Sequence, residues 1–257
     1  MVERANILKC MDRNESAPAI VISTDRRGDY DRQITLLSPV WGLRRVTCYG
    51  ARKSQKAAKA SLYTEATFNL YSNPERHSYS LVDLTVISDH SSILQSLECA
   101  FAAALMSELA MLEKGEEAES LYSLFTISLD EVDEENWRRI LIQFILRYLD
   151  LVGLGTDYVS CPVCSKLYAD GDILGFSSTL GVPCCPNCDN MAGELILPPN
   201  ARAYLRDSLR TERERAMQFR ISGNMEMRLL RYLTRTLTYI LSVDLKCLKS
   251  GLLNSLQ

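Results

Sequence analysis

The 257-residue chain is predicted to be an α+β protein, in which a five-stranded β-barrel precedes an α-helical domain with an embedded four-cysteine metal site. Three observations predict this fold class. Apolar residues alternate with period two up to about residue 88, they return every three or four residues afterwards, and two Cys-x-x-Cys pairs interrupt the helical part. The predicted units are an N-terminal extension (1–17), the barrel (18–88), the helical domain (89–160 and 198–257) and a metal-binding insertion (161–197).

The barrel is predicted from five short extended runs that are separated by turn residues. The runs cover residues 19–23, 33–41, 43–51, 66–71 and 79–87. Residues 25–29, Gly42 and residues 72–75 supply turns, and the Ala- and Lys-rich segment 54–60 is expected to form a helical turn. This count matches a small barrel of the OB type, and other five-stranded barrels fit the same count.

The helical domain is predicted from apolar residues at helical spacing. The first helix is expected to be capped by Ser88 or Asp89 and to continue to Leu112, because residues 94, 97, 101, 105, 109 and 112 are apolar. Further helices are expected at 119–129, at 137–152 before Gly153, at 201–220, at 224–241 and at 244–256. The predicted bundle is therefore split by the cysteine segment.

The two cysteine pairs predict one structural zinc ion. They are Cys161 with Cys164 and Cys185 with Cys188, with 20 residues between the pairs. Each pair turns two thiolates toward one point, and four sulfurs complete the tetrahedral shell that Zn²⁺ prefers, with no open position for a substrate. Two unrelated pairs of buried cysteines would not explain the matched Cys-Pro-x-Cys form. Cys184 could replace its neighbour as a ligand, but the two-residue spacing favours Cys185.

The composition places the chain among soluble intracellular proteins. Its first 16 residues are too charged for a secretory signal, and no apolar run reaches the roughly 20 residues of a membrane span. Nine cysteines in such a chain indicate a reducing compartment and metal ligands in preference to disulfides. We therefore expect a cytoplasmic, nucleoid-associated protein without a membrane partner.

The net charge of −3 conceals an uneven distribution along the chain. Residues 1–80 carry 13 basic and 8 acidic side chains (+5), residues 81–160 carry 4 and 15 (−11), and the remainder carry 12 and 9 (+3). An acidic total does not exclude a polyanion partner, because binding depends on the local field. The acidic middle is better suited to protein partners, and the basic ends are the candidate nucleic-acid surfaces.

The basic residues of the barrel region are the candidate DNA-binding residues. They are Arg26, Arg27, Arg32, Arg44, Arg45, Arg52, Lys53, Lys56 and Lys59, with Tyr30, Trp41 and Tyr49 as candidate stacking residues. In an OB barrel the first loop and the face around strands two and three form the oligonucleotide groove. The alternative is that these are solvated charges and core aromatics. The cysteine segment itself is a poor DNA-binding surface, because its loop contains one lysine and two aspartates and so carries no net positive charge.

A second basic face is possible if residues 201–220 form one helix. At 100° per residue, five arginines would then share one side, unless a kink near Thr211 breaks the row. They are Arg202, Arg206, Arg210, Arg213 and Arg220. No phosphate-binding loop, catalytic triad or zinc deaminase signature is present in the sequence, so we expect no enzyme.

The order of these pieces resembles the bacterial RecO family of DNA repair proteins. The resemblance rests on short segments: AIVISTD (19–25), DRQITLLS (31–38), GARKS (50–54), LDLVG (149–153), LRYL (230–233) and LKS (248–250). It implies an OB-fold domain, a helical domain with a zinc site, and a protein that binds single- and double-stranded DNA and anneals complementary strands.

The resemblance also implies partners. The family works with RecR to help load RecA recombinase onto strands covered by single-stranded DNA-binding protein (SSB). Its DNA contacts would fall here on Arg44, Arg45, Arg52, Lys53 and Lys56, and its pocket for the SSB C-terminal tail on Arg138, Arg139 and Arg147. From the residues alone, a zinc-containing protein-interaction adaptor with incidental DNA contact stays open as the alternative, and an uncharacterised hydrolase is a third reading.

Overall fold

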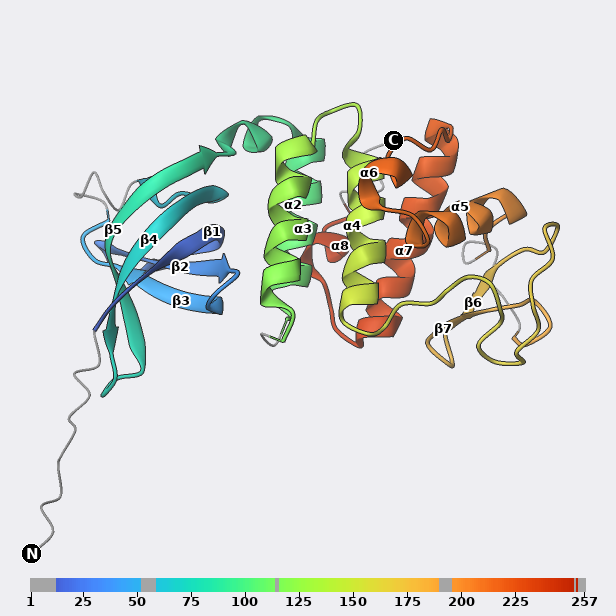
Figure 1. The fold of residues 1–257 in the computed structure, drawn as a ribbon, viewed down its shortest axis with the longest axis horizontal. Coiled ribbons are helices and arrows are strands. Elements are labelled where there is room, and N and C mark those ends of the chain that lie inside the picture. The colour runs from blue at the N-terminus through green and yellow to red at the C-terminus, as the bar shows by residue number, and fades with distance from the viewer. Residues whose placement is uncertain (1–12, 52–58, 114–115, 190–195, 252, 254–257) are drawn as a thin grey trace, which may run out of the picture. The chain divides into compact units, whose positions relative to one another are not determined.

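The computed structural model describes residues 13–51, 59–113, 116–189, 196–251 and 253, and it divides after Asp89 into two compact units (Figure 1). The first unit is a closed β-barrel and the second is a helical bundle that contains the cysteine segment. The predicted fold class is therefore confirmed. No helix in the part of the chain that the structure describes is long and apolar enough to cross a membrane.

The barrel closes in the strand order of an OB fold. Its strands are β1 (Asn14–Arg27), β2 (Asp31–Ser38), β3 (Gly42–Cys48), β4 (Thr64–Asn73) and β5 (Ser78–Asp89). Neighbours in the barrel follow the order β1-β2-β3-β5-β4, and β4 pairs back with β1. All pairs are antiparallel except β3 and β5, which pair in parallel at two positions, Val46 with Tyr79 and Thr47 with Ser80.

Strand β1 begins earlier than the sequence predicts. It starts at Asn14, and residues 14–17, which we expected in the N-terminal extension, pair with β4 from Tyr71 to Phe68. The polar run Asn14-Glu15-Ser16 shows no apolar alternation, so its strand character comes from the ladder with β4. The first strand is therefore 14 residues long.

Alternation along β3 separates the barrel core from its outer surface. Val46 and Cys48 are buried in the core together with residues such as Ile34, Leu36 and Phe68. Since successive side chains of a strand point to opposite faces, Arg45 and Thr47 point away from the core; Arg45 is exposed, whereas Thr47 is only 3% exposed. This alternation decides which basic residues face outward.

The helical unit is built around α4. Its elements are η1 (Ser91–Gln95), α2 (Leu97–Ala110), α3 (Ala118–Glu131), α4 (Trp137–Leu151), α5 (Pro199–Leu209), α6 (Arg213–Ala216), α7 (Gly223–Leu241) and α8 (Lys246–Lys249). Helix α4 packs against α2, α3, α5 and α7. Edge-to-face ring pairs join it to its neighbours, with Trp137 against Phe101 of α2 and Phe144 against Phe125 of α3.

Two expected helices are interrupted in the structure, and one is shorter. The first expected helix is divided into η1 and α2, because Ser96 caps α2 by accepting a hydrogen bond from the Cys99 backbone N–H. The expected helix 201–220 is wrong, since α5 ends at Leu209 and α6 starts at Arg213. The last expected helix, 244–256, is present as the four-residue α8, and part of its range lies outside the described residues.

A polar stripe on α4 explains the break between α5 and α6. We define it as Arg139, Gln143 and Arg147, which recur every four residues on one side of a largely apolar helix. Arg147 Nη2 donates to the backbone oxygens of Ser208 (3.2 Å) and Thr211 (2.9 Å), so carbonyls at the end of α5 are satisfied without continuing the helix. Gln143 Nε2 donates to the Tyr204 hydroxyl (2.9 Å) and to Ser208 Oγ (3.1 Å).

Candidate metal centre and nucleic-acid interface

Four cysteines come together in the segment between α4 and α5. The Sγ atoms of Cys161, Cys164, Cys185 and Cys188 all lie within 4.8 Å of one another. Backbone hydrogen bonds fold each pair into a turn, with Ser165 N–H donating to Cys161 O (2.8 Å) and Cys188 N–H to Cys185 O (3.0 Å). The short hairpin of β6 (Gly175–Ser177) and β7 (Val182–Cys184) leads directly into the second pair.

The four sulfurs fit a tetrahedral metal ion. Sulfur–sulfur distances are 3.7 Å for Cys161 and Cys188, 3.7 Å for Cys164 and Cys185, and 3.5 Å for Cys185 and Cys188. A tetrahedron with metal–sulfur bonds of about 2.3 Å has edges of about 3.8 Å. The donor set and its size therefore match a four-coordinate ion with no open position.

The surroundings of the cluster favour thiolate at one ligand. Burial by itself raises the pKa of Cys161, but backbone N–H groups of Cys164 and Cys185 outweigh it and bring that pKa to about 6. The Cys188 pKa is raised by hydrogen bonds with the neighbouring thiols of Cys185 and Cys164. Four thiols this close cannot all ionise without a cation, so a divalent ion would resolve their mutual repulsion.

Cys184 lies outside the metal-binding group. It ends β7, is fully buried, and burial raises the pKa of its thiol to about 11. The group within ligand distance contains Cys185 and omits Cys184. The structure therefore agrees with the two-residue spacing in the sequence, which favours Cys185 over Cys184 as the ligand.

Arg202 joins the cysteine segment to the helical bundle. The side chain is 1% exposed, and its guanidinium donates to the backbone oxygens of Asp172 (3.2 Å), Tyr158 (3.1 Å) and Ala169 (2.7 Å). It also lies over the Tyr168 ring, 5.0 Å from the centroid, and that ring packs against the cysteine cluster. We therefore assign Arg202 a structural role.

The expected second basic face does not form. Besides Arg202, Arg213 is 7% exposed and pairs with Glu131 of α3 at 2.9 Å. Arg206 pairs with its neighbour Asp207 at 2.7 Å, whereas Arg210 and Arg220 are exposed. Since α5 ends at Leu209 and two of the five arginines are buried, the single-helix geometry behind the prediction is wrong.

The barrel arginines divide into two groups. Arg44 is held between the rings of Trp41 (4.7 Å) and Tyr79 (4.1 Å) and forms an ion pair with Glu15. Its side chain is 16% exposed, and Trp41 packs against the barrel core, so neither residue presents a free face to a ligand. Arg32 is half-buried and donates to Ala60 O at 3.3 Å.

The exposed group lies on the outer surface of the barrel. Arg26, Arg27, Arg45 and Lys59 are all exposed, as are Tyr30 (58%) and Tyr49 (63%). Arg27 reaches across from β1 and donates to the hydroxyl of Thr47 on β3. We call the exposed Arg27 and Arg45, together with the buried Thr47 that Arg27 contacts, the β3 outer face. The predicted residues Arg52, Lys53 and Lys56 lie outside the described residues.

The three central arginines contact different partners within the helical unit. Arg138 lies over the Trp137 ring at 4.7 Å. Arg139 donates to Glu226 of α7 at 2.7 Å, and Arg147 binds the carbonyls after α5. Burial, followed by the charge of Arg213, lowers the pKa of Arg147 from its ordinary value. Arg139 and Arg147 therefore bind the bundle together.

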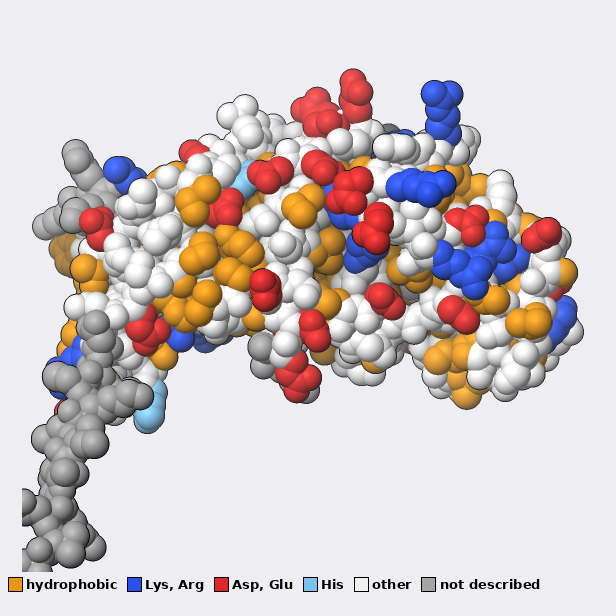
Figure 2. Space-filling model, in the orientation of Figure 1, with side chains coloured by type: hydrophobic (Ala, Val, Ile, Leu, Met, Phe, Trp, Pro, Cys, Tyr) orange, Lys and Arg blue, Asp and Glu red, His pale blue; other side chains and the backbone are white. Residues whose placement is uncertain are grey.

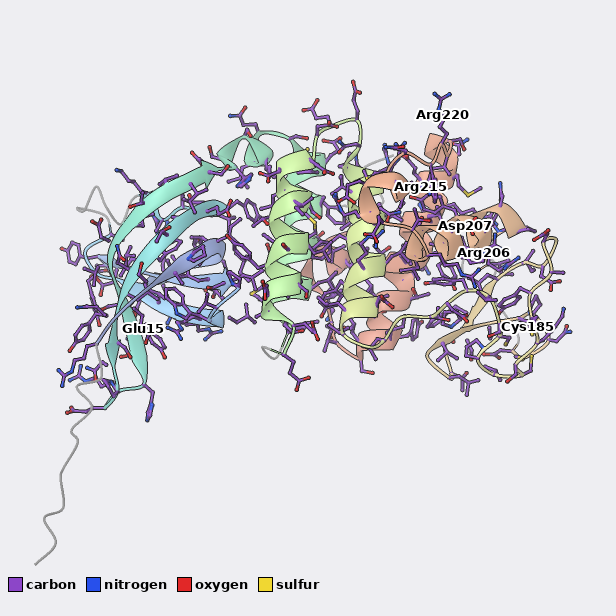
Figure 3. All side chains as sticks on the ribbon, viewed as in Figure 1. Glu15, Cys185, Arg206, Asp207, Arg215 and Arg220 are labelled. Atoms are coloured by element: carbon purple, nitrogen blue, oxygen red, sulfur yellow. The ribbon has the colours of Figure 1, made fainter. Side chains whose placement is uncertain are left out.

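A groove that the sequence did not predict lies between α5 and the start of α7. It encloses about 420 Å³. Its lining is Asn200, Ala203, Tyr204, Asp207, Phe219, Arg220, Ile221, Ser222 and Met225. Figure 3 labels Asp207 and Arg220 at this site, and Figure 2 shows Lys and Arg side chains on the surrounding surface. The prediction of one helix over 201–220 left no room for this groove. Ser222, which caps α7, is the sequence signal that could have indicated a helix start beside it.

Comparison with known proteins gives one consistent result. The model of the family described as "Recombination protein O C terminal" matches residues 94–249. A DNA repair protein RecO of Desulfatibacillum aliphaticivorans is 25% identical over 179 residues, which is 66% of this chain and 69% of that protein. The DNA repair protein RecO of Syntrophotalea carbinolica is 29% identical over 182 residues, covering 68% of this chain and 69% of the relative.

Replacing a true ligand should remove the metal, whereas replacing Cys184 should not. We expect purified Cys161→Ser and Cys185→Ser to lose most of the roughly one metal ion per chain that wild type carries, measured by elemental analysis, because three thiolates leave the shell incomplete. Cys184→Ser is the matched control and should keep its metal. Full metal content in Cys185→Ser would show instead that Cys184 takes over as ligand.

Removing the Arg202 guanidinium should destabilise the helical unit. Arg202→Met leaves three buried carbonyls without their donor, so we expect the free energy of unfolding in urea to fall by about 2–4 kcal/mol. Arg206→Met, on the same helix but with an exposed ion pair, should change it by less than about 1 kcal/mol. Equal stability of the two variants would contradict the structural role of Arg202.

Proposed function

We propose that this chain, which belongs to the RecO family, is a mediator that binds DNA, anneals complementary strands and helps load recombinase onto SSB-coated single strands. The family model covers more than half of the chain, and the similar proteins are named DNA repair proteins. A role in DNA repair and recombination follows from this membership. The annealing and loading steps are the finer part of the proposal, and we propose no catalytic step.

The observation that carries the proposal is the β3 outer face. Arg27 and Arg45 are exposed on the surface that OB barrels use for oligonucleotides, and the turn that follows β3 carries an exposed aromatic ring, Tyr49. Arginines that reach phosphates release counterions from DNA and supply affinity without sequence preference. Annealing needs such sequence-independent binding, because the protein must hold any pair of complementary strands.

We propose zinc as the ion in the four-cysteine site. A tetrahedral set of four sulfurs is typical of structural zinc sites, and a closed shell offers no position for a substrate. The loop of this segment is also a poor DNA surface, since its lysine, Lys166, pairs with Asp172 at 3.1 Å. The ion would then serve folding, and the DNA contacts would belong to the barrel.

We place the SSB C-terminal tail in the groove between α5 and α7. The family resemblance implies an apolar pocket with basic residues, and the groove combines the side chains of Tyr204, Phe219 and Met225 with Arg220. The start of the 19-residue helix α7 lies at the same groove and favours an anionic ligand. RecR, and RecA indirectly, are proposed as further partners from the resemblance alone.

Annealing of SSB-coated complementary strands tests the main proposal. Wild type should accelerate it, and single-strand affinity should fall steeply with salt, with a slope of about −0.7 per phosphate contacted. Arg27→Glu together with Arg45→Glu should reduce the steepness of that slope by about two contacts, while Arg231→Glu on α7 should leave it unchanged. No acceleration by wild type, or an affinity independent of salt, would favour the protein-interaction adaptor.

The groove can be tested separately with a labelled peptide of the cognate SSB C-terminal tail. We expect Phe219→Ala and Arg220→Glu each to weaken peptide binding roughly tenfold, measured by fluorescence anisotropy, because each removes part of the apolar or charged lining. Arg231→Glu, also on the helical unit, controls for net charge. Unchanged binding in both groove variants would place the tail elsewhere.

A further inference from the structure

The groove between α5 and α7 has two walls, and both are bonded to the cysteine segment. Tyr204 and Asp207 of α5 line one wall, and Ser222 and Met225 at the start of α7 line the other. Figure 3 labels Asp207 in this groove and Cys185 in the cysteine segment. The bonds between the two regions decide whether the metal site can influence a ligand in the groove.

Helix α5 is attached to the cysteine segment through Arg202 and Leu197. Two of the three carbonyls that accept from Arg202 belong to Ala169 and Asp172, in the loop between the two cysteine pairs. Leu197, just before α5, exchanges two backbone hydrogen bonds with Leu174, at 3.0 and 2.7 Å, and both of these side chains are buried. Because the groove residues follow Arg202 on the same helix, a shift of this loop would be transmitted to the first wall.

Helix α7 is attached through Tyr232. Its hydroxyl donates to the backbone oxygen of Gly175 in β6 at 3.0 Å, and its ring meets Phe176 edge to face, with 6.5 Å between the centroids. Tyr232 and Phe176 are each 1% exposed. Strand β6 pairs with β7, whose last residue, Cys184, precedes the predicted ligand Cys185. The second wall is therefore bonded to the hairpin that leads into the second cysteine pair.

The two cysteine pairs lie on either side of these attachments in the chain. One pair precedes the loop acceptors of Arg202, and the other follows β7. An ion that binds all four sulfurs would restrict the conformations of the intervening chain. Without the ion, the acceptors of Arg202 and Tyr232 would sample more conformations, and a ligand that needs fixed groove walls would have to order them at a cost in free energy.

We propose that metal binding at the four cysteines and peptide binding in the groove are positively coupled, with Arg202 and Tyr232 as the positioning residues that transmit the effect. The inference rests on the proposed function and adds the regulation of the same groove. An ion that served the folding of the whole unit would act on all its helices alike. The coupling that these bonds support is confined to α5 and α7.

The first test measures the affinity of the labelled SSB-tail peptide for the full-length protein loaded with zinc, and again after a chelator has removed the zinc under reducing conditions. Removal should weaken peptide binding roughly tenfold in wild type. Saturating peptide should raise the affinity for zinc by the same factor, measured by competition with a chromogenic chelator, because coupling between two ligands is reciprocal.

Variants of the attachments test how the effect is transmitted. Arg202→Met and Tyr232→Phe each remove a bond between the cysteine segment and one wall, so zinc removal should change their peptide affinity less than about threefold. Tyr232→Phe keeps the ring and serves as the second variant if Arg202→Met does not fold. Arg210→Met, which removes an exposed charge at the end of α5, is the matched control and should keep the tenfold effect.

Hydrogen exchange locates the effect without using the peptide. Zinc removal should raise amide exchange in α5 and α7 and leave α2 and α3 unchanged. Faster exchange in all four helices would show that the ion serves the whole unit, and it would overturn the proposed coupling. Unchanged exchange in α5 and α7 would overturn it as well.

The results separate the coupling from the proposed function. If the zinc-loaded protein does not bind the peptide, or if Phe219→Ala and Arg220→Glu bind it like wild type, the groove assignment fails, and the exchange pattern still decides whether the metal acts on the walls. If the peptide binds in the groove with one affinity in both metal states, the groove stands and the coupling is overturned. A tenfold loss that disappears in Arg202→Met and persists in Arg210→Met supports it.

Discussion

The helical unit depends on the three polar side chains of α4. Most of this helix is apolar and buried, and it packs against four other helices. Arg139, Gln143 and Arg147 face the chain between Tyr204 and Glu226, where they bind side-chain oxygens and backbone carbonyls. A buried donor without a partner costs about 1–3 kcal/mol, so these bonds fix where α5 ends and where α7 begins. The groove between those two helices is a consequence of the stripe.

Helix α5 connects the metal segment to this groove. Its buried Arg202 binds three carbonyls of the cysteine segment, while Ala203, Tyr204 and Asp207 of the same helix line the groove. A displacement of the metal segment would therefore move one wall of the groove. In the barrel, Arg44 likewise makes internal contacts, with Trp41, Tyr79 and Glu15. Its neighbour Arg45, on the opposite face of β3, is exposed and open to a ligand.

The sequence predicted those features that local patterns determine. Alternation identified five strands, and the cysteine spacing identified the cluster, because both depend on neighbours a few residues apart. It missed features that distant residues decide. The sequence allowed a kink near Thr211 but could not require one, because no glycine or proline marks 210–212 and the carbonyl of Thr211 binds Arg147 of another helix. Arg202 was predicted to lie on an exposed basic face. Its acceptors are backbone carbonyls, which every residue type has, so the sequence does not indicate its burial. Asn14 became a strand residue only through its pairing with Tyr71.

The polar stripe also sets the order in which the protein can fold during synthesis. Gln143 and Arg147 bind residues more than 60 positions later in the chain, and Arg139 binds Glu226, 87 positions later. Helix α4 therefore leaves the ribosome long before its polar side chains can be satisfied, whereas every strand of the barrel has been made by Asp89. The cysteine segment lies inside this long connection. A metal ion that joins Cys161 to Cys188 would shorten the loop still to be closed and so reduce its entropic cost.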